Sequence, residues 1–489
     1  MKITSAKGLP TSSVPVFVLR SGEKIERHNF FKGYKEKDRE YLRLFREKNK
    51  KGEYSHLLFL PSGRQAMLFQ LDGKKTFSLR NAITLMRRVV VTAKKEKIKE
   101  IAVQLEDFIP EKDTDEEALA ELMAAQFEIA NFEFMSYKTR PKEGWNVVEH
   151  IAVFSKENSQ KIQSALGRGK IIGEEINKAR TLSNTPGGDM TPARLAEAAV
   201  KSGREAGFKV KILQEKDIKK LNMGGVLGVS KGSSERPRFI VMEYMKGKRN
   251  EKPVVLIGKG VTFDTGGLNL KPSDSLSEMH LDMSGGAAVI HIITALARLK
   301  IKKNIVGLVP VAENMISGSS YHPGDVLKTM SGKTIEVLNT DAEGRVILSD
   351  ALEYSKRYKP RLVVDIATLT GAAMSALGQR ASAIFTTDPK IEKTLRETGE
   401  QTGDYVWPLP LWEEFEDEIK GTFGDFANIG KTRYGGAITG AVFLWQFIKG
   451  IPWVHIDIAP RMTAVEGEFL AKGAAGASIG LLTKFLREF

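Results

Sequence analysis

The hydrophobic pattern in the second half of the chain alternates continuous apolar segments with amphipathic ones. The apolar segments predict strands at 253–258, 304–313, 334–339, 361–370 and 453–459. The amphipathic segments between them predict helices at 284–300, 344–358, 437–448 and 477–489. Strands that are apolar on both faces and alternate with helices form a mainly parallel sheet covered on both sides. The pattern therefore predicts a large α/β domain with a mainly parallel, mixed sheet flanked by helices.

The first third of the chain has a similar but less regular alternation. It predicts strands at 13–20, 56–61 and 100–105 and helices at 79–97 and 114–134. A polar, amphipathic segment follows and ends at "NTPGGDMTP", where two prolines and two glycines interrupt the helical pattern. A chain of 489 residues is too long for one ordinary core. We expect an N-terminal α/β domain at 1–150, a helical linker at 151–183 and a catalytic domain at 184–489.

The composition limits the class of protein. Apolar residues make up 42% and charged residues 27%, as in globular proteins. No apolar segment reaches the length of a membrane span, and the N-terminus lacks the pattern of a signal peptide. The chain has no cysteine, which excludes disulfides, thiolate nucleophiles and thiolate zinc ligands. We therefore expect a soluble, cytoplasmic protein without membrane association.

The formal net charge of +14 raises the question of an anionic partner. Most basic residues are interleaved with acidic ones, and no RNA-binding or zinc-finger motif accompanies them. A solvated basic surface is the simpler interpretation. Nucleic-acid binding remains an alternative or additional role.

Acidic residues gather where predicted strands end or helices begin. Four of them share such positions: Asp264, Asp282, Asp341 and Glu343. Lys259 and Lys271 belong to the same segments. Because ligands of open α/β sheets bind at the carboxyl ends of strands, we expect these side chains to meet at one edge. Converging carboxylates repel one another, and two divalent cations would compensate them; oxygen ligands favour Mg or Mn, and Zn also accepts carboxylate.

Each of these residues also has an ordinary explanation when it is taken alone. Asp282 lies where a helix N-cap is expected, and "NTD" is typical of a turn. The glycine-rich "GKG" and "TGG" match neither the P-loop nor the Rossmann spacing. The seven histidines are scattered without an H-E-x-x-H pair, so a metal site here would lack histidine ligands. Only the combination of residues favours a metal centre.

The combined motifs resemble the leucyl (cytosol) aminopeptidase family. The family's signature is present without substitution as "NTDAEGR" at residues 339–345. It is accompanied, in the family's order, by "GKGVTFDTGGLNLKP", "MHLDMSGGAAV" and "DIATLTGA". The resemblance covers about residues 170–489, and the N-terminal third agrees with it only in position and length. It implies a metallo-exopeptidase, a hydrolase that releases N-terminal, Leu-like residues from peptides with a water activated by two metal ions.

The resemblance also implies a ligand set for two Mn or Zn ions per subunit. Asp264 and Glu343 would bridge both ions. Lys259 and Asp282 would complete one site. Asp341 would complete the other through its carboxylate and its main-chain carbonyl.

Further roles follow from the same resemblance. Lys271 and Arg345 would be the catalytic pair, with Arg345 holding a bicarbonate that acts as general base. The pocket for the first side chain of the substrate would be lined by Met279, Thr368, Gly371, Ala459 and Met462. The family assembles as a homohexamer, so we expect one here. Pro460 and Ala475 replace the family's usual Gly and Thr near this pocket. A two-metal phosphoesterase is the other enzyme class that uses such carboxylate clusters.

Overall fold

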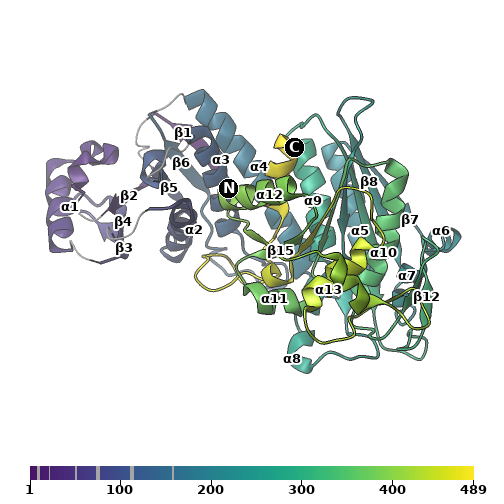
Figure 1. Ribbon diagram of the computed structural model, residues 1–489. Coiled ribbons are helices and arrows are strands. Elements are labelled where there is room, and N and C mark those ends of the chain that lie inside the picture. The colour runs from purple at the N-terminus through teal and green to yellow at the C-terminus, as the bar shows by residue number, and fades with distance from the viewer. Residues whose placement is uncertain (8–11, 21–22, 50–51, 73–76, 111–114, 157–158) are drawn as a thin grey trace. The chain divides into compact units, whose positions relative to one another are not determined.

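The computed structural model describes residues 1–7, 12–20, 23–49, 52–72, 77–110, 115–156 and 159–489 (Figure 1). The chain divides into two compact units. The first comprises Met1–Glu174 with the short segment Glu466–Ala471, and the second comprises Glu175–Val465 with Lys472–Phe489. The division falls within helix α4 (Ser159–Asn184), which therefore contributes residues to both units.

The first unit is built on a sheet with the strand order β1-β6-β5-β2-β4-β3 among the described residues. The strands are β1 (Lys2–Ala6), β2 (Val14–Arg20), β3 (Tyr54–Phe59), β4 (Gln65–Leu71), β5 (Glu100–Gln104) and β6 (His150–Phe154). All pairs are parallel except β3 with β4. Its longer helices are α1 (Glu36–Lys48), α2 (Leu79–Lys95) and α3 (Glu116–Asn131). The apolar faces of α2 and α3 share one core with the sheet, which confirms an N-terminal α/β fold.

Two details of this unit differ from the sequence expectation. Residues 151–154, the start of the segment predicted as a helical linker, belong to the interior strand β6 (His150–Phe154), because the apolar run "IAV" is buried between β1 and β5. The predicted helix at 114–134 begins at Glu116 with Asp115 as its N-cap, and Thr114 lies outside the described residues.

The second unit contains a larger mixed sheet. Its described strands follow the order β16-β15-β18-β14-β9-β11-β8-β7, with β10 pairing to β11. They are β7 (Lys209–Leu213), β8 (Arg238–Met245), β9 (Val254–Gly258), β10 (Gly260–Asp264), β11 (Asn304–Asn314), β14 (Leu362–Ala367), β15 (Ser382–Phe385), β16 (Val406–Pro408) and β18 (Trp453–Asp457). The centre, β18-β14-β9-β11-β10, is parallel throughout. This confirms the predicted fold class.

Helices cover both faces of this sheet (Figure 1). One layer contains α5 (Pro192–Ala206), α9 (Ser284–Arg298), α12 (Pro389–Thr402) and α14 (Ile479–Glu488). The other contains α7 (Gly224–Ser230), α10 (Glu343–Ser355) and α13 (Gly436–Trp445). Alternate residues of β9 face the two helix layers. Val255 and Ile257 share a core with Val346 and Ile347 of α10. The central strand is therefore buried on both sides, as its uninterrupted apolar sequence indicates.

Helix α9 extends an apolar stretch that begins in a preceding 3₁₀ turn. By length and composition alone, Met279–Arg298 could cross a membrane, which the sequence analysis did not indicate. In the fold, 83% of its apolar window is buried, as is typical of a core helix.

One predicted strand belongs to a different sheet. The segment 334–339 was expected to join the main sheet, but only Thr334–Glu336 is extended, as β13. It pairs with β12 (Val326–Lys328) and β17 (Phe426–Ala427) in a small separate sheet. The ladder ends because the next backbone N–H groups bond elsewhere: those of Leu338 and Asn339 both donate to the Asn428 side-chain oxygen, at 2.8 and 3.2 Å. The signature segment thus starts from a loop and not from the end of a main-sheet strand.

Candidate metal centre

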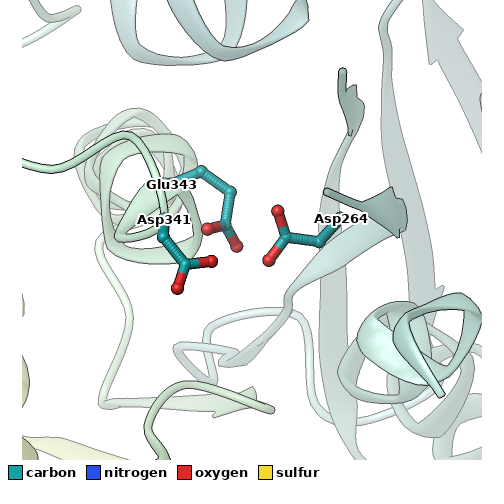
Figure 2. A group of neighbouring side chains, drawn as sticks. All are labelled: Asp264, Asp341 and Glu343. Carbon is teal, nitrogen blue, oxygen red and sulfur yellow. The ribbon is translucent and has the colours of Figure 1, made fainter. Parts of the chain in front are cut away.

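Four segments of the second unit bring the predicted acidic residues together. Asp264 is the last residue of β10, and Asp282 lies in the 3₁₀ turn Met279–Met283 before α9. Glu343 is the first residue of α10, and Asp341 lies in the loop just before it. Figure 2 shows the carboxylates of Asp264, Asp341 and Glu343 directed toward one another. One oxygen from each of these three lies within 4.8 Å of the other two.

Lys259 connects two of the segments. It lies between β9 and β10, at the carboxyl end of the central strand, and is 3% exposed. Its ammonium Nζ is 2.8 Å from both oxygens of Asp282 and 2.7 Å from Oε1 of Glu343. It also donates a hydrogen bond to the Thr368 carbonyl oxygen at 3.0 Å. A buried lysine at the end of a sheet strand is therefore paired with two of the acidic residues expected from the sequence, Asp282 and Glu343.

Lys271 closes the other side of the cluster. Its Nζ lies 2.8 Å from Oδ2 of Asp264 and forms a second ion pair with Asp341. The other oxygen of Asp264 accepts hydrogen bonds from the Gly266 amide and the Asn314 side chain, both at 2.8 Å. The Asp264 carboxylate is thus oriented from both sides, with one oxygen held by the protein frame and the other directed into the cluster.

The cluster retains unbalanced negative charge. When all four carboxylates are ionised, their ion pairs with the ammonium groups of Lys259 and Lys271 leave two negative charges among the described residues. Three buried carboxylate oxygens, Asp282 Oδ2, Asp341 Oδ1 and Glu343 Oε1, are contacted by these two ammonium groups as ion pairs. Buried, negative carboxylate oxygens that converge in this way are ligands that divalent cations accept. The residues present therefore fit a metal centre.

The pKa values in the cluster reflect the same crowding. Burial, aided by the charges of Glu343 and Asp282, raises the pKa of Asp264 well above its usual range. Burial also raises the pKa of Asp282 to about 7 and, together with Glu343, raises the pKa of Asp341. Glu343 is the exception: burial opposes its ionisation, but Lys259 and Lys271 outweigh it and lower its pKa. One carboxylate is thus stabilised as an anion while its neighbours resist ionisation.

Arg345 lies apart from these ion pairs. It is a residue of α10, 7% exposed, and its Nη1 donates to the Asn428 carbonyl oxygen at 3.0 Å. Its Nε has no hydrogen-bond partner, and burial lowers the pKa of its guanidinium to about 10. A buried cation with a free donor is suited to hold a small anion.

The expected pocket residues occupy neighbouring loops at the carboxyl ends of β14 and β18. Thr368 follows β14, and its hydroxyl donates to Asp282 Oδ1 at 2.7 Å. Gly371 begins α11 (Gly371–Leu377), which packs against the 3₁₀ turn beginning at Ala459. Met462 directly follows that turn, and Met279 begins the turn that carries Asp282; both are half-buried.

Sequence reasoning missed several residues that position the cluster. Asn314, at the end of β11, is fully buried and donates to Asp264 and to the Thr340 carbonyl oxygen. Tyr321, which is 1% exposed, donates to the same carbonyl at 2.7 Å. Asp457, the last residue of β18, accepts hydrogen bonds from the loop after β14. Only the position of Asn314 and Asp457 at strand ends could have indicated them.

The glycine of the signature has a steric role. A Cβ atom at Gly344 would lie 2.6 Å from Cε and 2.7 Å from Nζ of Lys259, too close for any two such atoms. The absence of a side chain at this position therefore creates the space in which the buried lysine reaches Glu343.

Comparison with known proteins agrees with this geometry. The model of the cytosol aminopeptidase family, catalytic domain, matches residues 177–483, more than half of the chain. The chain belongs to this family. A "Probable cytosol aminopeptidase" of Azoarcus sp. (strain BH72) is 49% identical over 328 residues, which cover 67% of this chain and 65% of that relative. One from Nitrosomonas europaea is 38% identical over 424 residues, which cover 86% and 84%.

A solved structure extends the similarity over both units. The "Bottromycin maturation enzyme BotP in complex with Mn" is similar over 98% of this chain and 99% of that chain, with a TM-score of 0.83 and 26% identity. The family and the α/β fold expected from the sequence are thus confirmed. The first relative is matched over slightly less than two thirds of its length.

Proposed function

We propose that this protein is a metal-dependent aminopeptidase that releases N-terminal amino acids from peptides. The observation that carries the proposal is the convergence of Asp264, Asp341 and Glu343, with one oxygen of each within 4.8 Å of the others, in a member of the cytosol aminopeptidase family. All the residues expected for metal binding and catalysis lie in the second unit. The four converging carboxylates, which outnumber the two lysine ammonium groups paired with them, support a metal centre.

Two divalent ions fit the number of carboxylates. Asp264 and Glu343 would bridge them, Lys259 and Asp282 would complete one site, and Asp341 would complete the other. Mn is supported by the similar BotP structure, which is a complex with Mn, and Zn accepts the same ligands. When bound, such ions polarise a carbonyl group and make water nucleophilic near neutral pH.

The side chains around the metal centre would have the remaining roles in the reaction. Burial lowers the pKa of Lys259, but its carboxylate neighbours outweigh this effect and raise the pKa. To bind a metal ion, Lys259 would have to lose its proton and ligate as a neutral amine. Lys271 would remain a cation, because the neighbouring carboxylates outweigh the burial that lowers its pKa and so raise it. From the edge of the cluster, its ammonium would stabilise the negative charge that develops on the scissile carbonyl oxygen. Arg345, with its free Nε, would hold a bicarbonate near the attacking water as a general base.

The preference for the first side chain belongs to the same proposal. Thr368, Gly371 and Ala459, with Met279 and Met462, would line its pocket. This lining is mainly apolar and suits a Leu-like residue, and Pro460 and Ala475 stand near it in place of the family's usual Gly and Thr. A homohexamer and a cytoplasmic location are proposed from the family, whose curated relatives carry the name cytosol aminopeptidase.

The deciding experiment measures metal content and hydrolysis in the same preparation. Protein loaded with Mn or Zn is expected to hold two ions per chain and to cleave Leu-p-nitroanilide, and chelation is expected to abolish cleavage. Loaded protein that ignores the anilide but cleaves p-nitrophenyl phosphate would favour the phosphoesterase alternative. Binding to duplex DNA with a steep salt dependence would support the nucleic-acid role suggested by the charge of +14.

A further inference from the structure

Asp457 is a buried carboxylate outside the metal cluster. It is the last residue of β18 and is 0% exposed. Its Oδ1 accepts hydrogen bonds from the backbone N–H groups of Leu369 at 3.1 Å, Thr370 at 3.5 Å and Ala459 at 3.1 Å. Its Oδ2 accepts from the Thr370 hydroxyl at 2.7 Å. Each donor comes from a loop that borders the proposed substrate pocket.

One of these hydrogen bonds links Asp457 to the metal cluster through a single peptide group. The carbonyl oxygen of Thr368 and the N–H of Leu369 belong to the same planar unit. The oxygen accepts from Lys259 Nζ at 3.0 Å, while the N–H donates to Asp457 at 3.1 Å. The peptide is therefore fixed at both ends, and Asp457 determines where its carbonyl oxygen meets Lys259.

A second hydrogen bond extends the same control to the pocket. The Thr370 hydroxyl that donates to Asp457 also accepts from the Ala373 amide at 3.1 Å, so it caps α11. Gly371, the first residue of α11, is thereby held relative to β18. Ala459, on the other wall, is held by its own N–H. The Asp457 carboxylate thus holds residues on both walls of the proposed pocket.

We propose that Asp457 is a positioning residue that sets the shape of the first-side-chain pocket and the direction of the Lys259 amine. This inference rests on the proposed aminopeptidase function. A neutral lysine ligand has one lone pair and two N–H groups, so a fixed acceptor at the Thr368 oxygen orients the lone pair toward the metal. Asp457 acts on that acceptor indirectly, through the Leu369 N–H of the same peptide group.

The role is geometric, and substitution can separate it from charge. In Asp457→Asn the side-chain oxygen keeps the backbone donors, and the amide faces a Thr370 hydroxyl that can accept as well as donate. Asp457→Ala removes every contact. Asp350→Ala is a matched control, because Asp350 is also 0% exposed and accepts backbone N–H groups of Met330 and Val226, at 2.8 and 3.0 Å, away from the pocket.

The test compares three readouts in wild type and these variants. They are the KM for Leu-p-nitroanilide, the ratio of kcat/KM for Leu- and Ala-anilides, and the Mn dissociation constant from calorimetry, which needs no activity. We expect Asp457→Ala to raise KM and weaken Mn binding, each about tenfold, and to lower the Leu:Ala ratio. Asp457→Asn is expected to restore all three to within about threefold of wild type. Asp350→Ala is expected to lower only thermal stability.

The opposite results would overturn the inference. If Asp457→Ala loses stability as Asp350→Ala does but keeps all three readouts, Asp457 is merely structural. If Asp457→Ala does not fold, Thr370→Val decides: it removes one hydroxyl, and an unchanged Leu:Ala ratio contradicts the proposal. If wild type shows no aminopeptidase activity, the proposed function fails, and the Mn affinities still decide whether Asp457 positions Lys259.

Discussion

Replacing Gly344 by alanine is the most discriminating perturbation of this centre. The new methyl carbon would lie 2.6 Å from Cε, 2.7 Å from Nζ and 2.8 Å from Cδ of Lys259. Carbon atoms in contact are normally about 3.5–4.0 Å apart, so the lysine has to retreat by about 1 Å. Lys259 is 3% exposed and is held by Asp282, Glu343 and the Thr368 carbonyl, so any retreat breaks contacts at the centre.

Two effects of Gly344→Ala oppose each other, and their sizes differ. Alanine in a helix is more favourable than glycine by about 1 kcal/mol, which would stabilise the start of α10. A displacement of about 1 Å at a reacting centre costs about 100-fold in rate, and a disturbed ligand costs about 10- to 100-fold in metal affinity. We therefore expect activity to fall about 100-fold and Mn affinity at least tenfold. The melting temperature is expected to fall as well, because disturbing a buried ion pair costs more than the helix gains from alanine.

The assay combines Leu-p-nitroanilide kinetics, Mn calorimetry and thermal unfolding of Gly344→Ala. Gly167→Ala is the control, because this glycine lies in helix α4 and a Cβ there has no neighbour within 4 Å. It is expected to leave activity and Mn affinity at wild-type values. If Gly344→Ala also keeps both, the steric reasoning about Lys259 is refuted.

Three further predictions concern the same unit. Asp264→Asn and Glu343→Gln are expected to lose metal and activity together, measured by elemental analysis and anilide hydrolysis; full turnover in either contradicts the bridging roles. Lys271→Ala is expected to keep its metal and lose about 100-fold or more in kcat, and a rise in KM alone would make Lys271 a binding residue. Burial raises the pKa of Asp350 to about 7 in the fold, so the folded state binds the extra proton. Its contribution to stability is therefore present below pH about 4 and lost as pH rises through about 7. Asp350→Asn is expected to flatten this part of the melting-temperature profile, and parallel profiles would contradict the assignment.

The sequence was sufficient where local pattern and topology agree. Uninterrupted apolar strands such as 253–258 and 361–370 became β9 and β14, because a strand buried on both faces excludes polar residues. Parallel strands direct their carboxyl ends to one edge, which is why Lys259 could be placed near Asp264 before any coordinates were known. The signature "NTDAEGR" identified the family, which the catalytic-domain match confirmed.

Prediction from the sequence failed where a distant side chain ends a strand by taking its backbone hydrogen bonds. Asn428 takes the N–H groups of Leu338 and Asn339, which removes the second half of the predicted strand 334–339 from its ladder. Nothing in that segment signals a partner some 90 positions away. Strand β10 was not predicted, because its glycine and polar residues interrupt the apolar pattern that indicates a strand. In the fold it pairs with β11.

Residue types and their order thus determined the fold class, the identity of the charged groups and the edge at which they gather. Tertiary structure decided their relations: the Lys259 ammonium between Asp282 and Glu343, the space left by Gly344, and the peptide group held between Lys259 and Asp457. Strand periodicity is a local property that the chain carries in its own sequence. Distances of about 3 Å between groups up to 109 positions apart arise only when the packed core fixes every element at once.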